Sequence, residues 1–199
     1  MAEAVPDFET MLAASADAAP LSRPRVLVAG IGNIFFADDG FGPEVASRLG
    51  NEDLPDWVKV EDFGIRSIHL AYELMEGYDE LVLIDATPRK EDEPGTVYLI
   101  EPDLSELPAT LLDAHTMNPA TVFSMLDNLG GTPPKTVIVG VEPLSDDEEI
   151  GLSPPVAAAV GEAVRMVKQV LAEMPYGSDA SAPQTLDTPD AELRAGQEE

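Results

Sequence analysis

The chain has 199 residues, and its 38 Asp and Glu outnumber its 11 Lys and Arg so strongly that the net charge is −27 at pH 7. Such a negative field repels phosphate backbones and anionic membranes, which argues against a nucleic-acid partner. The sequence contains no cysteine, so disulfides and thiolate catalysis are excluded. The acidity is either a solvated surface or a docking surface for a basic partner protein.

The two ends of the chain differ in composition from the middle. Residues 1–22 and 175–199 are polar and acidic and lack the apolar spacing of helices or strands, so we expect two disordered tails around a single domain at 23–174. The first segment has no basic residue and its apolar residues are interrupted by acids, which argues against a signal peptide. No apolar run is long enough to span a membrane. We expect the protein to be cytoplasmic and monomeric.

Apolar runs and periodicity predict strands in alternation with helices. Helix starts are indicated by Ser67 as an N-cap, by Asn118 followed by Pro119, and by Ser153 followed by Pro154. Strands are expected near residues 25–30, 58–62, 80–85, 95–101 and 135–141, and helices near 41–51, 67–77, 118–130 and from 153 onward.

The connections between these elements predict the topology. The first three strands are joined through helices, and right-handed crossovers make such strands parallel. The link from Asp85 to Gly95 is too short for a crossover helix, so the fourth strand should be antiparallel. The predicted fold is a three-layer α/β/α domain, with a mixed five-stranded sheet that is mostly parallel, one antiparallel strand and helices on both faces.

Carboxylates follow the first and third strands. If the strand order is 2-1-3, a crevice opens where these two strands end, and it brings Asp38 and Asp39 close to Asp85. Asp38 or Asp39 could instead cap the helix that begins at Phe41. Asp85 follows four apolar residues, and an unpaired carboxylate in such a place is costly to keep ionised. We therefore expect Asp85 to be functional.

The sequence has only two histidines. His115 precedes the Asn118 helix start by three residues and should lie at the same rim, whereas His69 falls inside the second helix and is expected at the surface. Two carboxylates and one imidazole suit a borderline divalent ion such as nickel, zinc or manganese. Without a thiolate, such a site should bind weakly, which favours a metal that is delivered or shared by a substrate.

The turn after the first strand has other interpretations. Gly30 and Gly32 imitate the start of a dinucleotide fingerprint, but Phe35 stands in place of the third glycine and two acids follow. No Gly-x-Ser-x-Gly motif is present. A paired-carboxylate protease is conceivable, although adjacent residues on one turn seldom aim at one water. Metal-assisted or carboxylate-assisted hydrolysis fits the residues best.

Four motifs resemble the hydrogenase maturation proteases, the endopeptidases that trim the C-terminus of the nickel-iron hydrogenase large subunit. The resemblance covers about residues 26–171. The motifs are Gly30-Ile-Gly-Asn33 with Asp38-Asp-Gly-Phe-Gly42, Leu83-Ile-Asp-Ala86, His115 before the third helix, and Gly140-Val-Glu-Pro143 followed by Gly151-Leu-Ser-Pro-Pro-Val156.

The resemblance implies metal ligands at Asp39, Asp85 and His115, with Asp39 where well-known members have Glu. It implies nickel, carried by the precursor of the large subunit, as the recognition element, and zinc or another divalent ion could substitute. Asp38 is then the candidate base that activates a water. Relatives are commonly grouped with aspartic-type endopeptidases. The alternative function is a non-catalytic checkpoint or chaperone that binds the same metal-loaded precursor, and a nucleotide binder is a third, weaker reading.

Overall fold

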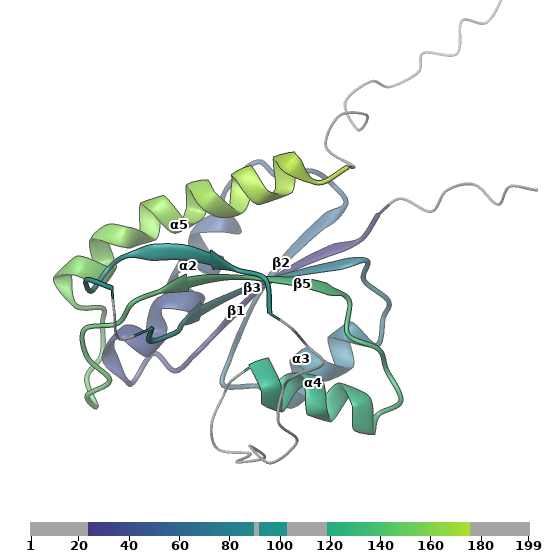
Figure 1. The fold of residues 1–199 in the computed structure, drawn as a ribbon, viewed down its shortest axis with the longest axis horizontal. Coiled ribbons are helices and arrows are strands. Elements are labelled where there is room, and N and C mark those ends of the chain that lie inside the picture. The colour runs from purple at the N-terminus through teal and green to yellow at the C-terminus, as the bar shows by residue number, and fades with distance from the viewer. Residues whose placement is uncertain (1–23, 90–91, 103–118, 176–199) are drawn as a thin grey trace, which may run out of the picture.

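The computed structural model describes residues 24–89, 92–102 and 119–175 (Figure 1). The predicted acidic tails lie almost entirely outside these residues. The strands are β1 (Val26–Ile31), β2 (Val58–Gly64), β3 (Glu80–Ala86), β4 (Val97–Ile100) and β5 (Lys135–Val141). The helices are the 3-10 helix η1 (Ala37–Gly40), α2 (Phe41–Leu49), α3 (Ser67–Leu74), α4 (Pro119–Asn128) and α5 (Pro154–Glu173).

The five strands form one mixed sheet in the order β2-β1-β3-β5-β4. Strand β1 pairs in parallel with β2 and β3, and β3 pairs in parallel with β5. Strand β4 is antiparallel to β5. Both the predicted 2-1-3 order and the antiparallel fourth strand are confirmed. From β1 the chain first adds β2 on one side and then β3 on the other side. The carboxyl ends of β1 and β3 therefore lie beside each other at the switch point of the sheet.

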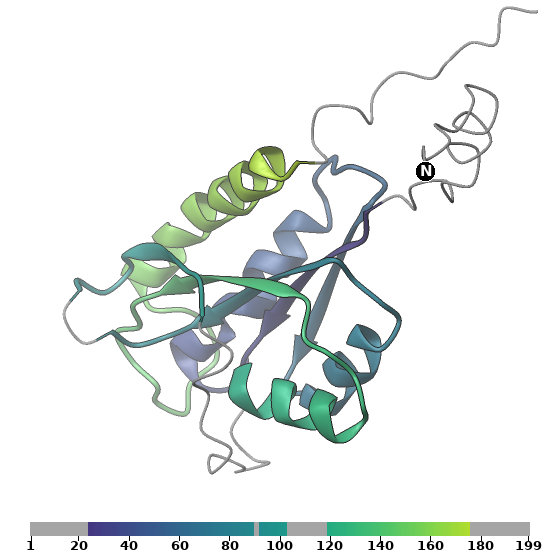
Figure 2. The same ribbon diagram turned by 45° about the vertical axis from the view of Figure 1, so that its right-hand side comes forward.

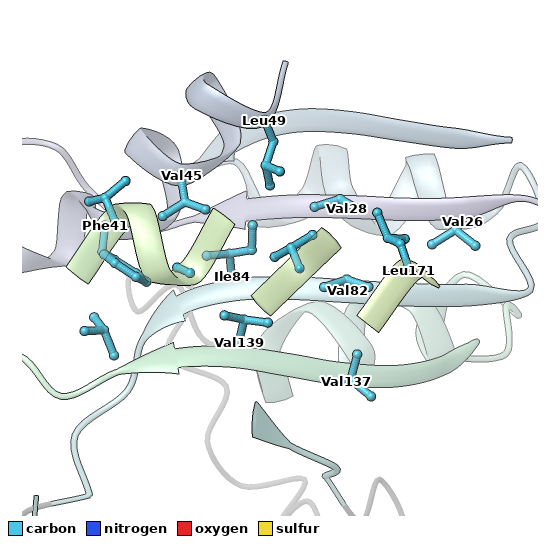
Figure 3. Close-up of a cluster of buried hydrophobic side chains, with 14 of the residues drawn as sticks. Val26, Val28, Phe41, Val45, Leu49, Val82, Ile84, Val137, Val139 and Leu171 are labelled. Atoms are coloured by element: carbon cyan, nitrogen blue, oxygen red, sulfur yellow. The ribbon is translucent and has the colours of Figure 1, made fainter. Parts of the chain in front are cut away.

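Helices cover both faces of the sheet, as predicted: α2 and α5 lie on one side, and α3 and α4 on the other (Figures 1 and 2). Strand β1 is buried along its whole length because its alternate side chains enter two different cores. Val26 and Val28 pack with α2 and α5, together with Val82 of β3 and Leu171 (Figure 3). Leu27 and its alternating neighbours pack against α3 and α4. Continuous apolar strands are what a sheet buried on both faces requires.

The predicted helix starts have different outcomes. Ser153 is the N-cap of α5 and Pro154 is its first residue, as predicted. The prediction that Ser67 caps α3 is wrong, because Ser67 is already helical and buried and the N-cap is Arg66. The Arg66 side chain donates to the carbonyl oxygen of Phe63 over 3.0 Å and so braces this corner without a serine cap. Asn118 lies outside the described residues.

No helix among the described residues is long and apolar enough to cross a membrane.

Candidate active site

The turn between β1 and α2 is shaped by glycines at places where a side chain cannot fit. Gly32 has φ +126°, and a Cβ there would lie 1.9 Å from the backbone oxygen of Asp39. Gly42 lies where α2 crosses the ends of β1 and β3, and a Cβ there would lie 2.2 Å from the oxygen of Ile31 and 2.4 Å from that of Ile84. The two glycines therefore bring Asp39 back over the end of β1 and close to the end of β3.

Asp39 is half-buried on this turn. Its Oδ2 accepts a hydrogen bond of 2.6 Å from the backbone N–H of Asn33. Burial raises the pKa of Asp39, the Asn33 hydrogen bond partly opposes that rise, and the charge of Asp146 adds to it.

Asp85 is the sixth residue of β3 and only 6% exposed. Its Oδ2 accepts a long hydrogen bond of 3.4 Å from the Thr87 hydroxyl. Burial raises the pKa of Asp85 well above its ordinary value, and the charge of Asp39 raises it further, against the hydrogen bonds from Ala86 and Thr87. The charge of Asp39 thus opposes ionisation of Asp85. The two carboxylates thus lie close enough to repel each other, as the strand order predicted.

A divalent cation would relieve this repulsion, and carboxylate oxygens are ligands that suit it. His115, the third predicted ligand, lies outside the described residues. Within those residues no group of three or more His, Cys, Asp or Glu side chains could hold a metal ion. The ligand set Asp39, Asp85 and His115 therefore stays a prediction, of which the described structure brings the two carboxylates together. His69 is exposed on α3, as expected.

Asp38 is next to Asp39 in the sequence, but its carboxylate accepts hydrogen bonds from a different part of the chain. It is fully buried, at 0% exposure. Its Oδ2 accepts from the backbone N–H groups of Leu144 (2.8 Å) and Ser145 (3.0 Å) and from the Ser153 hydroxyl (2.9 Å), and its Oδ1 accepts from the Ser153 N–H (2.7 Å). The expectation that Asp38 or Asp39 caps α2 is wrong, because the N-cap is Gly40 and no side chain caps it.

The segment of residues 144–153 is here called the β5–α5 loop. Its contacts with the β1 turn are the part of the site that the sequence did not predict. The loop lies at the carboxyl edge of the sheet, beside the start of α2 (Figure 1). Together with the β1 turn it lines an open cavity of about 460 Å³. The wall residues from the turn are Ile34, Ala37 and Gly40, and those from the loop are Ile150, Gly151 and Leu152. The sequence predicted Ser153 as a helix start and as part of a family motif, but no local pattern joins it to Asp38.

A sheet of this order, with two neighbouring carboxylates where β1 and β3 end, places the chain among the open α/β proteins whose site lies at the switch point of the sheet. Comparison with known proteins defines the family. The sequence profile of the hydrogenase maturation protease family HycI matches residues 43–170. The chain belongs to this family, and it is a hydrogenase maturation endopeptidase that processes a large-subunit precursor.

Individual relatives agree. The chain is 34% identical over 153 residues to the hydrogenase 2 maturation protease of Escherichia coli strain K12, covering 75% of this chain and 92% of the relative. It is 35% identical over 155 residues to the hydrogenase expression/formation protein HupD of Bradyrhizobium diazoefficiens, covering 75% and 79%. Among solved structures, the hydrogenase maturating endopeptidase HybD from E. coli superposes with a TM-score of 0.62 at 33% identity, covering 75% of this chain and 93% of that one.

Proposed function

We propose that the chain removes a C-terminal peptide from the nickel-loaded precursor of a nickel-iron hydrogenase large subunit and thereby activates it. The nickel belongs to the precursor and is read by Asp39, Asp85 and His115. The observation that carries the proposal is the pair of neighbouring carboxylates, Asp39 and Asp85, at the ends of β1 and β3, whose ionisation is opposed by burial and by mutual repulsion. Such a pair is unfavourable in an empty site and favourable beside a cation.

The donor set explains why the metal would arrive with the substrate. Two carboxylates and one imidazole hold nickel or zinc weakly compared with sites that include thiolates. An affinity that is high only when the precursor supplies further ligands discriminates loaded from unloaded precursor. When bound, the ion would supply electrophilic polarisation of a nearby carbonyl.

The role of Asp38 as a base stays a prediction. A base has to reach the proton that it abstracts. The Asp38 carboxylate is fully buried and already accepts four hydrogen bonds from the β5–α5 loop. A substrate water could approach it only by replacing one of these donors.

The direct test is to incubate the chain with nickel-loaded precursor and to measure the mass of the precursor and of the released peptide. Wild type is expected to release one short C-terminal peptide. Asp85→Ala and His115→Ala are expected to stop the release, while Asp127→Asn, a change on the exposed face of α4, leaves it unchanged. Full cleavage by both Ala variants would refute the assignment of the site.

A further inference from the structure

We propose that Asp38 is a positioning residue, which fixes the β5–α5 loop against the β1 turn and so builds the wall that contacts the precursor. The expected effect on precursor cleavage rests on the proposed function. The role of Asp38 in holding the loop rests on the geometry alone. This role of the buried carboxylate differs both from helix capping and from general-base catalysis.

The hydrogen bonds of Asp38 all lead to one segment. The four donors to its carboxylate come from Leu144, Ser145 and Ser153, which are 106 to 115 residues away in the sequence. They lie at the first two positions and the last position of the β5–α5 loop. One carboxylate therefore fixes both ends of the loop. A buried carboxylate that satisfies four donors leaves them unpaired when it is removed, which is costly.

Backbone contacts join the same two segments. The N–H of Ala37 donates to the Glu149 oxygen over 2.7 Å, and the N–H of Asp38 donates to the Ser145 oxygen over 3.3 Å. Ala37 has φ +39°, a left-handed conformation that is unfavourable for a residue with a side chain. Such strain persists only where surrounding contacts enforce it. The Glu149 contact is placed at this strained residue and holds the middle of the loop.

The loop in this position presents apolar side chains at the rim. Leu144 is 57% exposed and Ile150 is 74% exposed, although both are large and apolar. Ile150 also lines the cavity of about 460 Å³, which Ile34 from the β1 turn lines as well. The loop and the turn supply part of the lining of this cavity, and residues of α2 and α5 supply most of the rest. Gly40, the residue after Asp39, also lines the cavity, so a precursor that reaches Asp39 meets this rim and a displaced loop weakens precursor binding.

The two roles of Asp38 predict different kinetics. Loss of a general base lowers kcat by about 100-fold to 10,000-fold. Loss of a positioning contact lowers the fraction of chains that can bind, and the apparent affinity falls by that fraction. If Asp38→Asn leaves about one chain in ten with the loop in place, KM for the precursor rises about tenfold and kcat changes little. The Asn amide adds an N–H donor where four donors already converge.

The experiment combines amide hydrogen exchange with steady-state cleavage of nickel-loaded precursor. In Asp38→Asn, the amides of the β5–α5 loop should exchange faster while those of β1 and β3 stay protected, and KM should rise about tenfold with kcat within about threefold. Ser153→Ala leaves the carboxylate in place and removes one of its four bonds, so it should show the same changes to a smaller extent. Glu148→Gln makes the same carboxylate-to-amide change at an exposed residue of the same loop, outside the hydrogen bonds of Asp38, and should show neither effect.

Three results would overturn the inference: a kcat that falls at least a hundredfold in Asp38→Asn, loop amides that exchange as in wild type, or an unchanged KM. If Asp38→Asn does not fold, Ser153→Ala decides by the same measurements. Failure of the proposed function is recognised separately, because wild type then releases no peptide while the exchange of the loop amides still reports on the positioning role.

Discussion

Replacing Asp85 by Asn should stabilise the folded chain at neutral pH while it destroys the site. Asp85 is 6% exposed, accepts one long side-chain hydrogen bond from Thr87, and lies beside the charge of Asp39. Its pKa is therefore higher in the folded than in the unfolded chain. The stabilising contribution of such a group is complete below the unfolded pKa and is lost as pH rises through the folded pKa. At neutral pH the raised pKa of Asp85 is thus a cost in folding free energy that Asn does not carry.

The size of the effect follows from two opposing contributions. Each unit by which the pKa is raised corresponds to about 1.4 kcal/mol. The Asn amide needs hydrogen-bond partners of its own, and incomplete pairing costs about 1 kcal/mol or more. We expect a net stabilisation on the order of 1 kcal/mol, the usual size of a single-residue effect, and for a domain of this size each kcal/mol raises the melting temperature by about 2–4 °C.

Urea unfolding in the presence of a chelator measures this difference. Asp85→Asn should be more stable than wild type at pH 8, and the gap should shrink at pH 5, where Asp85 of the folded wild type holds its proton more often. Asp127→Asn is the matched control, and its exposed position should keep its effect within about 0.5 kcal/mol. If Asp85→Asn is no more stable than wild type at pH 8, surrounding interactions offset the cost of ionising the buried carboxylate. That result would refute the reasoning.

Further predictions concern the packing of the turn and the ligands. Gly42→Ala drives a methyl group against two backbone oxygens 2.2 and 2.4 Å away; overpacking of this kind costs about 1–3 kcal/mol or more, so an unchanged thermal midpoint would contradict the packing. Asp39→Glu, which introduces the residue typical of the family, should keep the cleavage rate within about tenfold of wild type, whereas Asp39→Asn should abolish cleavage. Equal cleavage rates for these two variants would remove Asp39 from the ligand set. His115→Ala should abolish cleavage, and a cleaving variant would exclude His115 as a ligand.

The sheet could be predicted because its strands carry local signals. Val26–Ile31 and Glu80–Ala86 read as short apolar runs with acids at or after their ends, and the short link after Asp85 requires an antiparallel strand. The strand order then brings Asp39 and Asp85 together without any knowledge of side-chain contacts. The sheet and the carboxylate pair can thus be predicted from apolar periodicity and from the lengths of the connections between elements.

The environment of Asp38 could not be predicted, because it depends on tertiary contacts. Its partners in the β5–α5 loop lie more than a hundred residues away and are mostly backbone N–H groups, which carry no residue-specific signal. Local reasoning offered only a helix cap or a free base. Ser67 failed for a similar reason, because the neighbouring Arg66 braces the corner through backbone carbonyls.

The central claim is that Asp39, Asp85 and His115 recognise nickel in the precursor. The most direct measurement is the ratio of cleavage rates on nickel-loaded and nickel-free precursor, determined for wild type and for Asp85→Asn at equal protein concentrations. The account predicts rapid cleavage of loaded precursor by wild type, no detectable cleavage of unloaded precursor, and none of either by the variant. Equal rates on both precursors by wild type would contradict it.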